Sequence, residues 1–150
     1  MKSIELLAPA KDLQAAVAAV DYGADALYIG GARFGARHAA GNSAEEIARA
    51  VEYAHQYGVR VHATLNTLLY DGELAEAERQ ARELIAAGVD ALHVDYGCYE
   101  AWYKAIPTVY QDAPTAAWLA AEVRNVVSVP VLTTGKLNDP NVAEKVLQDG

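Results

Sequence analysis

Aromatic side chains that could contact a planar ligand are concentrated in one short stretch, between Asp95 and Lys104. The stretch contains Tyr96, Tyr99, Trp102 and Tyr103. It follows an apolar run that predicts a strand at 91–94, so the rings fall in a loop at the carboxyl end of that strand. One interpretation is an apolar wall for a planar ligand, with a tyrosine hydroxyl as proton donor. The other is a lid that packs over the mouth of a barrel.

Basic and amide side chains that could hold an anion follow two other predicted strands. Arg33 and Arg37 lie in the loop after the second predicted strand. Arginines at such a position suit phosphate or carboxylate ligands, and a solvated loop with incidental ion pairs is the alternative. Asn66 follows the third predicted strand, where its side chain either contacts a ligand amide or caps the loop.

A glycine and a lysine follow the fifth predicted strand. Gly135 and Lys136 lie between that strand and the next helix, where a late unit of a barrel commonly holds a phosphate group. This pair predicts an anion site.

The histidines and the single cysteine indicate structural roles. His62 lies within a predicted strand and His55 near a helix end, and both are expected to be structural or surface residues. His93 alternates with apolar residues, which allows it to point into a barrel interior. Because no second His or Cys stands at metal-ligand spacing with it, we predict no metal site. Cys98 is expected to be a buried or idle thiol, and as the only cysteine it excludes an internal disulfide.

Five short apolar runs predict buried strands that alternate with helices. The strands are expected at 4–8, 26–29, 59–65, 91–94 and 129–132. Glycines end the first three helices, at Gly23, Gly58 and Gly88. Ser43 and Glu46 form a capping-box pair at the start of the second helix, and Asp139 before Pro140 predicts the start of the last. Such alternation is typical of a parallel sheet with crossover helices.

One phrase occurs twice at corresponding places in this pattern. GADAL at 23–27 and GVDAL at 88–92 each join the end of a helix to the start of a strand. In both, the apolar run leaves the aspartate, Asp25 or Asp90, at the rim of the sheet.

The choice of α/β architecture is between a (β/α) barrel and an open doubly wound sheet. No glycine-rich phosphate fingerprint follows the first strand, where APAK stands at 8–11, so a dinucleotide-binding fold is disfavoured. We predict one partial (β/α) TIM-type barrel domain over 1–150, with about five parallel units. Because a full barrel needs eight units and ~250 residues, we expect either a fragment or a homo-oligomer that covers open sheet edges.

Composition narrows the class of partner. The chain is 53% hydrophobic with 21% charged residues, which supports a packed core. Its formal net charge of −8 makes nucleic acid an unlikely partner and argues against anionic membrane surfaces. No apolar run approaches the ~18 residues of a membrane span, and the N-terminus does not resemble a signal peptide. We therefore expect a cytoplasmic protein that acts on a small molecule.

The N-terminal half, to about residue 95, resembles peptidase family U32, the collagenase-like proteases. The matching phrases are ELLAPA at 5–10, DYGADALYIGG at 21–31, RFGAR at 33–37 and LNTL at 65–68. The resemblance implies a protease or an RNA- or quinone-hydroxylation enzyme, with Arg33, Arg37 and Asn66 binding an anionic or RNA-like substrate. The family's later cysteine-rich signature, which in some members would hold an iron–sulfur cluster, does not occur in this chain.

From about residue 88 onward, the chain resembles the Old Yellow Enzyme family of FMN oxidoreductases, in its enoate and dienoyl-CoA reductase branch. The matching phrases are HVDYGCYEAWY at 93–103, IPTVYQ at 106–111 and VSVPVLTTGKLNDP at 127–140. If both resemblances hold, the two families join near 88–95, as in a chimeric or truncated chain.

The reductase resemblance implies a set of site residues. Gly135 and Lys136 would hold the FMN phosphate, with lysine standing where arginine is usual. Tyr99 or Tyr103 would donate the proton, and Trp102, near the position of a family histidine, would line the substrate. Ala8 and Pro9, at the end of the first strand in both families, and Asn66 would contribute further to cofactor binding.

Three functions follow from these resemblances. The leading hypothesis is an FMN-dependent ene-reductase that reduces an activated C=C bond at the expense of NAD(P)H. The second is a U32-like protein of the protease or the RNA- or quinone-hydroxylation type. The third is an inactive barrel module that oligomerises.

Overall fold

The computed structural model describes residues 4–34, 41–66, 71–95 and 102–149. Five parallel strands form one sheet in the order β1-β2-β3-β4-β5. Their bounds are β1 (Leu7–Ala10), β2 (Ala26–Gly30), β3 (Arg60–Leu65), β4 (Ala91–Val94) and β5 (Val131–Thr133). Strands that follow one another in sequence are neighbours in space, as in a (β/α) barrel. The predicted partial barrel of parallel α/β units is therefore confirmed.

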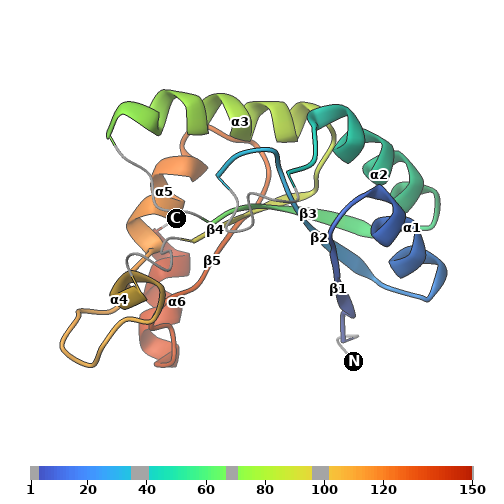
Figure 1. Cartoon of the computed structure of the whole chain (residues 1–150). Coiled ribbons are helices and arrows are strands. Elements are labelled where there is room, and N and C mark those ends of the chain that lie inside the picture. The colour runs from blue at the N-terminus through green and yellow to red at the C-terminus, as the bar shows by residue number, and fades with distance from the viewer. Residues whose placement is uncertain (1–3, 35–40, 67–70, 96–101, 150) are drawn as a thin grey trace.

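The helices alternate with these strands. Their bounds are α1 (Leu13–Asp21), α2 (Ala44–Gln56), α3 (Leu74–Ala86), α4 (Trp102–Ala105), α5 (Ala117–Arg124) and α6 (Pro140–Asp149), with a 3₁₀ turn η2 (Asp71–Glu73) before α3. Helices α1, α2, α3 and α5 follow one another around one side of the curved sheet (Figure 1). No described helix is long and apolar enough to cross a lipid bilayer.

Both predicted helix starts are confirmed by the capping contacts. The Ser43 hydroxyl accepts the backbone N–H of Glu46, and the Glu46 carboxylate accepts the backbone N–H of Ser43. At α6, the Asp139 carboxylate accepts the N–H of Asn141. These side chains satisfy N–H groups that have no partner within their own helices.

The strand bounds differ most from the prediction at β1 and β5. β1 was expected to end before Pro9, but it runs through Pro9, whose partner in the ladder is Tyr28. Among the described strands β1 pairs with β2 alone, so Pro9 has no neighbour on the other side that needs its missing N–H. β5 begins at Val131 rather than 129, after Pro130, whose carbonyl accepts the N–H of Leu92.

One face of the sheet forms the hydrophobic core with the helices. Buried strand residues on this face include Leu27, Ile29, Val61, Ala63, Leu65, Leu92 and Val94. They pack against apolar stripes that include Val20 of α1, Ile47 and Val51 of α2, and Leu84 of α3. Since side chains alternate along a strand, the intervening residues must lie on the opposite, inner face.

The inner face carries two rows of side chains, set by the strand register. The lower row consists of Pro9, Tyr28, His62 and Ala91. The upper row, nearer the carboxyl edge, consists of Gly30, Thr64, His93 and Leu132. None of these residues belongs to the core between sheet and helices. Polar and aromatic side chains are therefore gathered on the face that the core-forming helices do not cover.

The repeated aspartates have the same role at the opposite, amino edge. Asp25 donates its N–H to the Leu6 carbonyl at 2.9 Å, and its carboxylate accepts the Leu6 N–H at 2.8 Å. Asp90 makes the identical pair of bonds with Val61, at 2.8 and 2.7 Å. Each aspartate thus closes the gap between a strand and the start of the next strand. The edge they occupy is the one associated with stability in barrels.

Candidate functional site

Of the predicted anion-binding residues, Arg33 has a side-chain partner within the chain. The guanidinium of Arg33 forms an ion pair with Glu76 of α3 and lies 5.2 Å above the Phe34 ring. The backbone N–H of Asn66 donates to the Phe34 carbonyl at 2.9 Å. Arg37 lies outside the described residues. The proposed substrate contacts of these side chains remain predictions.

The ammonium of Lys136 binds backbone carbonyls of this chain. Its ammonium donates to the carbonyls of Thr108, at 2.9 Å, and Gln111, and lies 3.4 Å from that of Val109. Gly135 has a φ of +101°, and a Cβ there would lie 2.3 Å from the Thr115 hydroxyl oxygen. The glycine and lysine therefore shape the turn after β5 and tie it to the 108–111 segment. Their predicted phosphate role is untested.

The described aromatic residues of the predicted site and the predicted cofactor residues of the first strand lie on different elements, α4 and β1. Trp102 and Tyr103 are exposed on the short helix α4, and Tyr99 lies outside the described residues. Pro9 is on the inner face of β1 beside Tyr28, whereas Ala8 packs toward the core. Neither Ala8 nor Pro9 carries a side-chain hydrogen-bonding group. Their assignment to cofactor binding stays a prediction.

The polar cluster that the fold assembles is on the inner face. We call Tyr28, His62, Thr64 and His93 the inner-face patch. The rings of Tyr28 and His93 are tilted by 57° with centroids 6.3 Å apart. In the strand register, His62 is the neighbour of Tyr28 and Thr64 is the neighbour of His93. Three adjacent strands thus place two imidazoles, a phenol and a hydroxyl together.

An anchored carboxylate adjoins this patch at the carboxyl edge. Asp95 follows β4, and its backbone N–H donates to the Leu65 carbonyl at 3.1 Å. Its two carboxylate oxygens lie 2.6 and 2.7 Å from the Thr134 hydroxyl, which donates to the carboxylate. Oδ2 is also 3.6 Å from Nε2 of His93, within ion-pair distance. Asp95 is therefore held on the side of His93 that faces the carboxyl edge, where barrel enzymes place their working groups.

Sequence reasoning assigned His62 a structural role and gave Asp95 and Thr134 none. The available signal was polar residues two apart, at His62 and Thr64 and at His93 and Asp95. A spacing of two places such residues on one side of a strand. The register that aligns the two pairs comes only from the fold.

The environment of His62 favours its neutral imidazole. Burial is the largest cause that lowers the pKa of this ring below its ordinary 6.5, followed by the charge of Arg60, with a smaller contribution from His93. The carboxylate of Asp90 acts in the opposite direction. At neutral pH His62 is an uncharged group with one N–H donor and one nitrogen acceptor.

This shift predicts a pH-dependent stability. The unfolded chain protonates His62 near its ordinary pKa of about 6.5, whereas the folded chain resists protonation. Stability from this residue is therefore complete above pH 6.5 and is lost as the pH falls below that value. We expect the free energy of unfolding, measured by urea denaturation, to fall less between pH 7 and pH 5 in His62→Gln than in the parent chain. An equal or larger fall in the variant would contradict the assignment.

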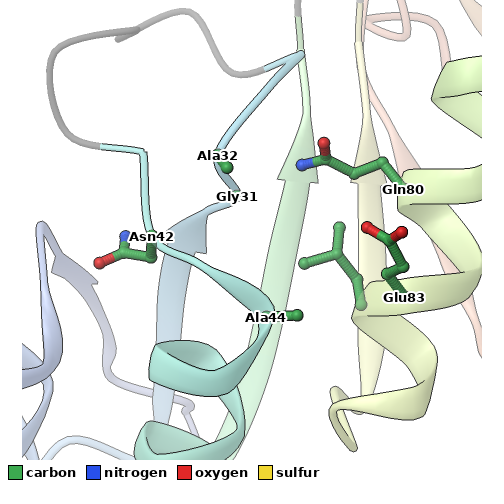
Figure 2. A pocket seen from close by; sticks show the side chains of 7 residues that line it. Gly31, Ala32, Asn42, Ala44, Gln80 and Glu83 are labelled. Atoms are coloured by element: carbon green, nitrogen blue, oxygen red, sulfur yellow. The ribbon is translucent and has the colours of Figure 1, made fainter.

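A small cavity lies on the helix side of the same edge. It is lined by Gly31, Ala32, Asn42, Ala44, Gln80, Glu83 and Leu84. Gln80 and Glu83 project from α3 toward the segment between β2 and α2 (Figure 2). Its volume of about 30 Å³ admits about one water molecule and no substrate. The Gln80 amide beside it donates to the Arg33 carbonyl at 2.9 Å, so the side chain fixes the loop after β2.

Comparison with known protein families shows to which family the chain is related. The model of peptidase family U32 matches residues 11–138, which include all of α1 to β5. The chain belongs to peptidase family U32. The predicted join of two families near 88–95 lies inside this matched range, and β4 pairs with both β3 and β5 there. A join at that place stays a prediction.

Curated relatives of this U32 chain include RNA-modification proteins. It is 52% identical over 98 residues to 23S rRNA 5-hydroxycytidine C2501 synthase of Escherichia coli (strain K12), covering 65% of this chain and 15% of the relative. It is 40% identical over 94 residues to tRNA hydroxylation protein P1 of Bacillus subtilis (strain 168), covering 62% and 22%. The chain thus spans less than a quarter of the length of either relative.

Solved structures support the barrel fold. A dihydrodipicolinate synthase superposes with a TM-score of 0.61 over 97% of this chain and 53% of its own, at 12% sequence identity. At that identity the likeness shows the fold alone. The U32 chain therefore has the architecture of a partial barrel with five parallel strands.

The prediction of an FMN-dependent ene-reductase is wrong. A cinnamate reductase of Clostridium sporogenes (strain ATCC 7955) does match, but at 33% identity over 78 residues, 52% of this chain and 12% of the relative. The RNA-modification relatives match at 52% and 40% over longer segments. A glycine followed by a cation late in a barrel is too general a feature to specify FMN. The FMN and NAD(P)H predictions depended on that hypothesis and are untested.

Proposed function

We propose that this chain forms part of the barrel of a U32 protein that hydroxylates a nucleotide in RNA. The observation that carries the proposal is the 52% identity with the rRNA 5-hydroxycytidine synthase. The tRNA hydroxylation protein supports the same reaction class. The inner-face patch supplies polar and aromatic groups near the carboxyl edge, the functional edge of barrel enzymes.

The proposal departs from the expectation that nucleic acid is an unlikely partner. The net charge of −8 argues against affinity from general attraction to phosphates. Recognition of RNA also proceeds through single unstacked bases that stack on aromatic side chains and hydrogen-bond through their edges. An acidic barrel segment is compatible with that mode when basic contacts are made elsewhere in the full-length protein.

The test is a segment exchange in living cells. Residues of this chain replace the matched segment of the Escherichia coli synthase and, separately, of the Bacillus subtilis tRNA hydroxylation protein, each in a strain lacking its own gene. Hydroxylated nucleosides in rRNA and tRNA are then measured by mass spectrometry of digested RNA. We expect at least one hybrid to restore its modification. The matched control carries the superposed half of a dihydrodipicolinate synthase, which shares the fold at 12% identity, and is expected to restore none.

If neither hybrid modifies RNA although both accumulate to parental levels and melt cooperatively, the proposed function is contradicted. Restoration of only one modification identifies whether rRNA or tRNA is the substrate class.

A further inference from the structure

Two polar side chains of the inner-face patch are buried without being paired. His62 is 8% exposed and Thr64 is 3% exposed. Within the described part of the chain, neither the His62 ring nor the Thr64 hydroxyl has a hydrogen-bond partner, and no fully buried side-chain polar atom is left unpaired. The hydrogen-bonding atoms of these two residues are therefore not completely enclosed by the described chain. They have bonding capacity that the chain itself does not use.

The patch extends over three neighbouring strands and two residue rows. Neighbouring strands lie about 4.8 Å apart and residues two apart along a strand lie roughly 6.8 Å apart, so the patch covers about 10 by 7 Å. Gly30 occupies the upper row above Tyr28 and places no side chain there. A single six-membered ring fits this area, with Tyr28 and His93 available for contact with its face or edge.

The charges near the inner-face patch favour an uncharged ring over a phosphate. Three described basic side chains have partners within the chain: Arg33 pairs with Glu76, Arg60 with Glu5, and Lys136 with backbone carbonyls. Asp95 adds a negative charge at the carboxyl edge, beside His93. Desolvated anions need charged or multiple N–H partners, which the described patch does not offer. A base with donors and acceptors on its edge matches a neutral imidazole and a hydroxyl.

We propose that the inner-face patch binds one unstacked pyrimidine base, with His62 and Thr64 bonding its edge, His93 contacting its ring, and Asp95 with Thr134 positioning His93. This assignment rests on the proposed function for its substrate class, and it adds the residues that receive the base. A pyrimidine inside a folded RNA must leave its stack to reach a patch on the inner face of a barrel sheet.

The test is a titration of the full chain with cytidine, followed through the ring signals of its histidines by NMR. We expect the His62 and His93 signals to shift saturably. His55 is the internal control because it lies on α2 and pairs with Asp90 at 2.9 Å, at the amino edge. Its signal should stay constant. Ribose 5-phosphate is the second probe, and it should produce no saturable shift.

Matched variants locate the site. Thr64→Val keeps the volume of the side chain and removes its hydroxyl, and His62→Gln keeps a polar edge while removing the ring. Each should weaken cytidine binding at least tenfold. Thr133→Val makes the same change as the first variant on β5, where Thr133 is the register partner of the core residue Val94, and should leave binding unchanged.

Three results would overturn the proposal: no saturable shift in the parent chain, a response to ribose 5-phosphate equal to that with cytidine, or unchanged binding in folded Thr64→Val. The titration of the parent chain can contradict the proposal by itself. The proposal therefore remains testable even if a variant fails to fold. If another part of the barrel or a second copy of the chain fills this face, cytidine will not shift either signal. Failure here combined with RNA modification by a hybrid would reject the site and leave the proposed function standing, and the converse result would reject the function alone.

Discussion

Replacing Leu92 by alanine is expected to lower the free energy of unfolding by about 3 kcal/mol, within the range of roughly 2–5 for buried leucines. Leu92 lies on β4 and is 0% exposed, facing the helices between its register partners Ala63 and Val131. Truncation removes apolar contacts and leaves a cavity that close-packed neighbours fill only in part. A loss of this size is a large fraction of the roughly 5–15 kcal/mol typical of a domain.

Urea denaturation followed by circular dichroism provides the measurement. The control is Leu147→Ala on α6, where the leucine is 78% exposed and the change should stay within about 0.5 kcal/mol. If Leu92→Ala costs no more than this control, Leu92 does not lie in the core between sheet and helices. The assignment of the inner face, which follows from the same alternation, would then also be wrong.

The order of strands and helices could be predicted because its signals are local. Apolar runs, the glycines after the helices and the capping box at Ser43 each act within a few residues. Gly23, Gly58 and Gly88 all have positive φ, as the prediction of helix ends requires. The boundary at Pro9 was misplaced because the tolerance of proline depends on whether its strand has a neighbour on both sides. That information is not local.

The candidate site was predicted less well because it depends on register and direction. Periodicity shows that His62 and Thr64 lie on one side of a strand but not which side faces the helices. The partners of Arg33 and Lys136 are 43 and 25 to 28 residues away in sequence. Both cations were predicted to meet a ligand, and that prediction is untested; the structure shows that both have contacts within the chain. The position of a charged residue after a strand thus predicts that it lies at an edge of the sheet. It does not predict which group the charged side chain contacts.

The two family resemblances also differ in how specific their matching phrases are. The phrases DYGADALYIGG and RFGAR contain the strand, the turn and the loop of one specific unit, and they led to the family that the chain belongs to. The phrase around Gly135 and Lys136 describes a turn in which the ammonium ties backbone carbonyls together. Such a turn can recur in barrels with different chemistry, because it stabilises the loop after a strand whatever reaction the barrel catalyses.

The aspartate of the second repeated phrase is expected to contribute strongly to stability. In Asp90→Ala we expect the free energy of unfolding to fall by about 2 kcal/mol, since hydrogen bonds to charged groups contribute roughly 1.5–3. The variant deprives the N–H of Val61, a fully buried residue at the amino end of β3, of its acceptor at 2.7 Å. The bond to His55 is exposed and adds little.

Asp25→Ala is the matched comparison because Asp25 makes the same pair of bonds with Leu6. Leu6 is 58% exposed, so water can replace the lost acceptor and the expected cost is less than about 1 kcal/mol. Asp90→Asn keeps an oxygen acceptor and should lie between the two. Equal losses in both alanine variants, measured by the same urea denaturation, would show that burial of the released N–H does not set the cost. If Asp90→Ala costs more than Asp25→Ala, the two repeated segments make the same backbone bonds but stabilise the fold to different extents. The larger contribution is then at β3, the strand that also carries His62 and Thr64.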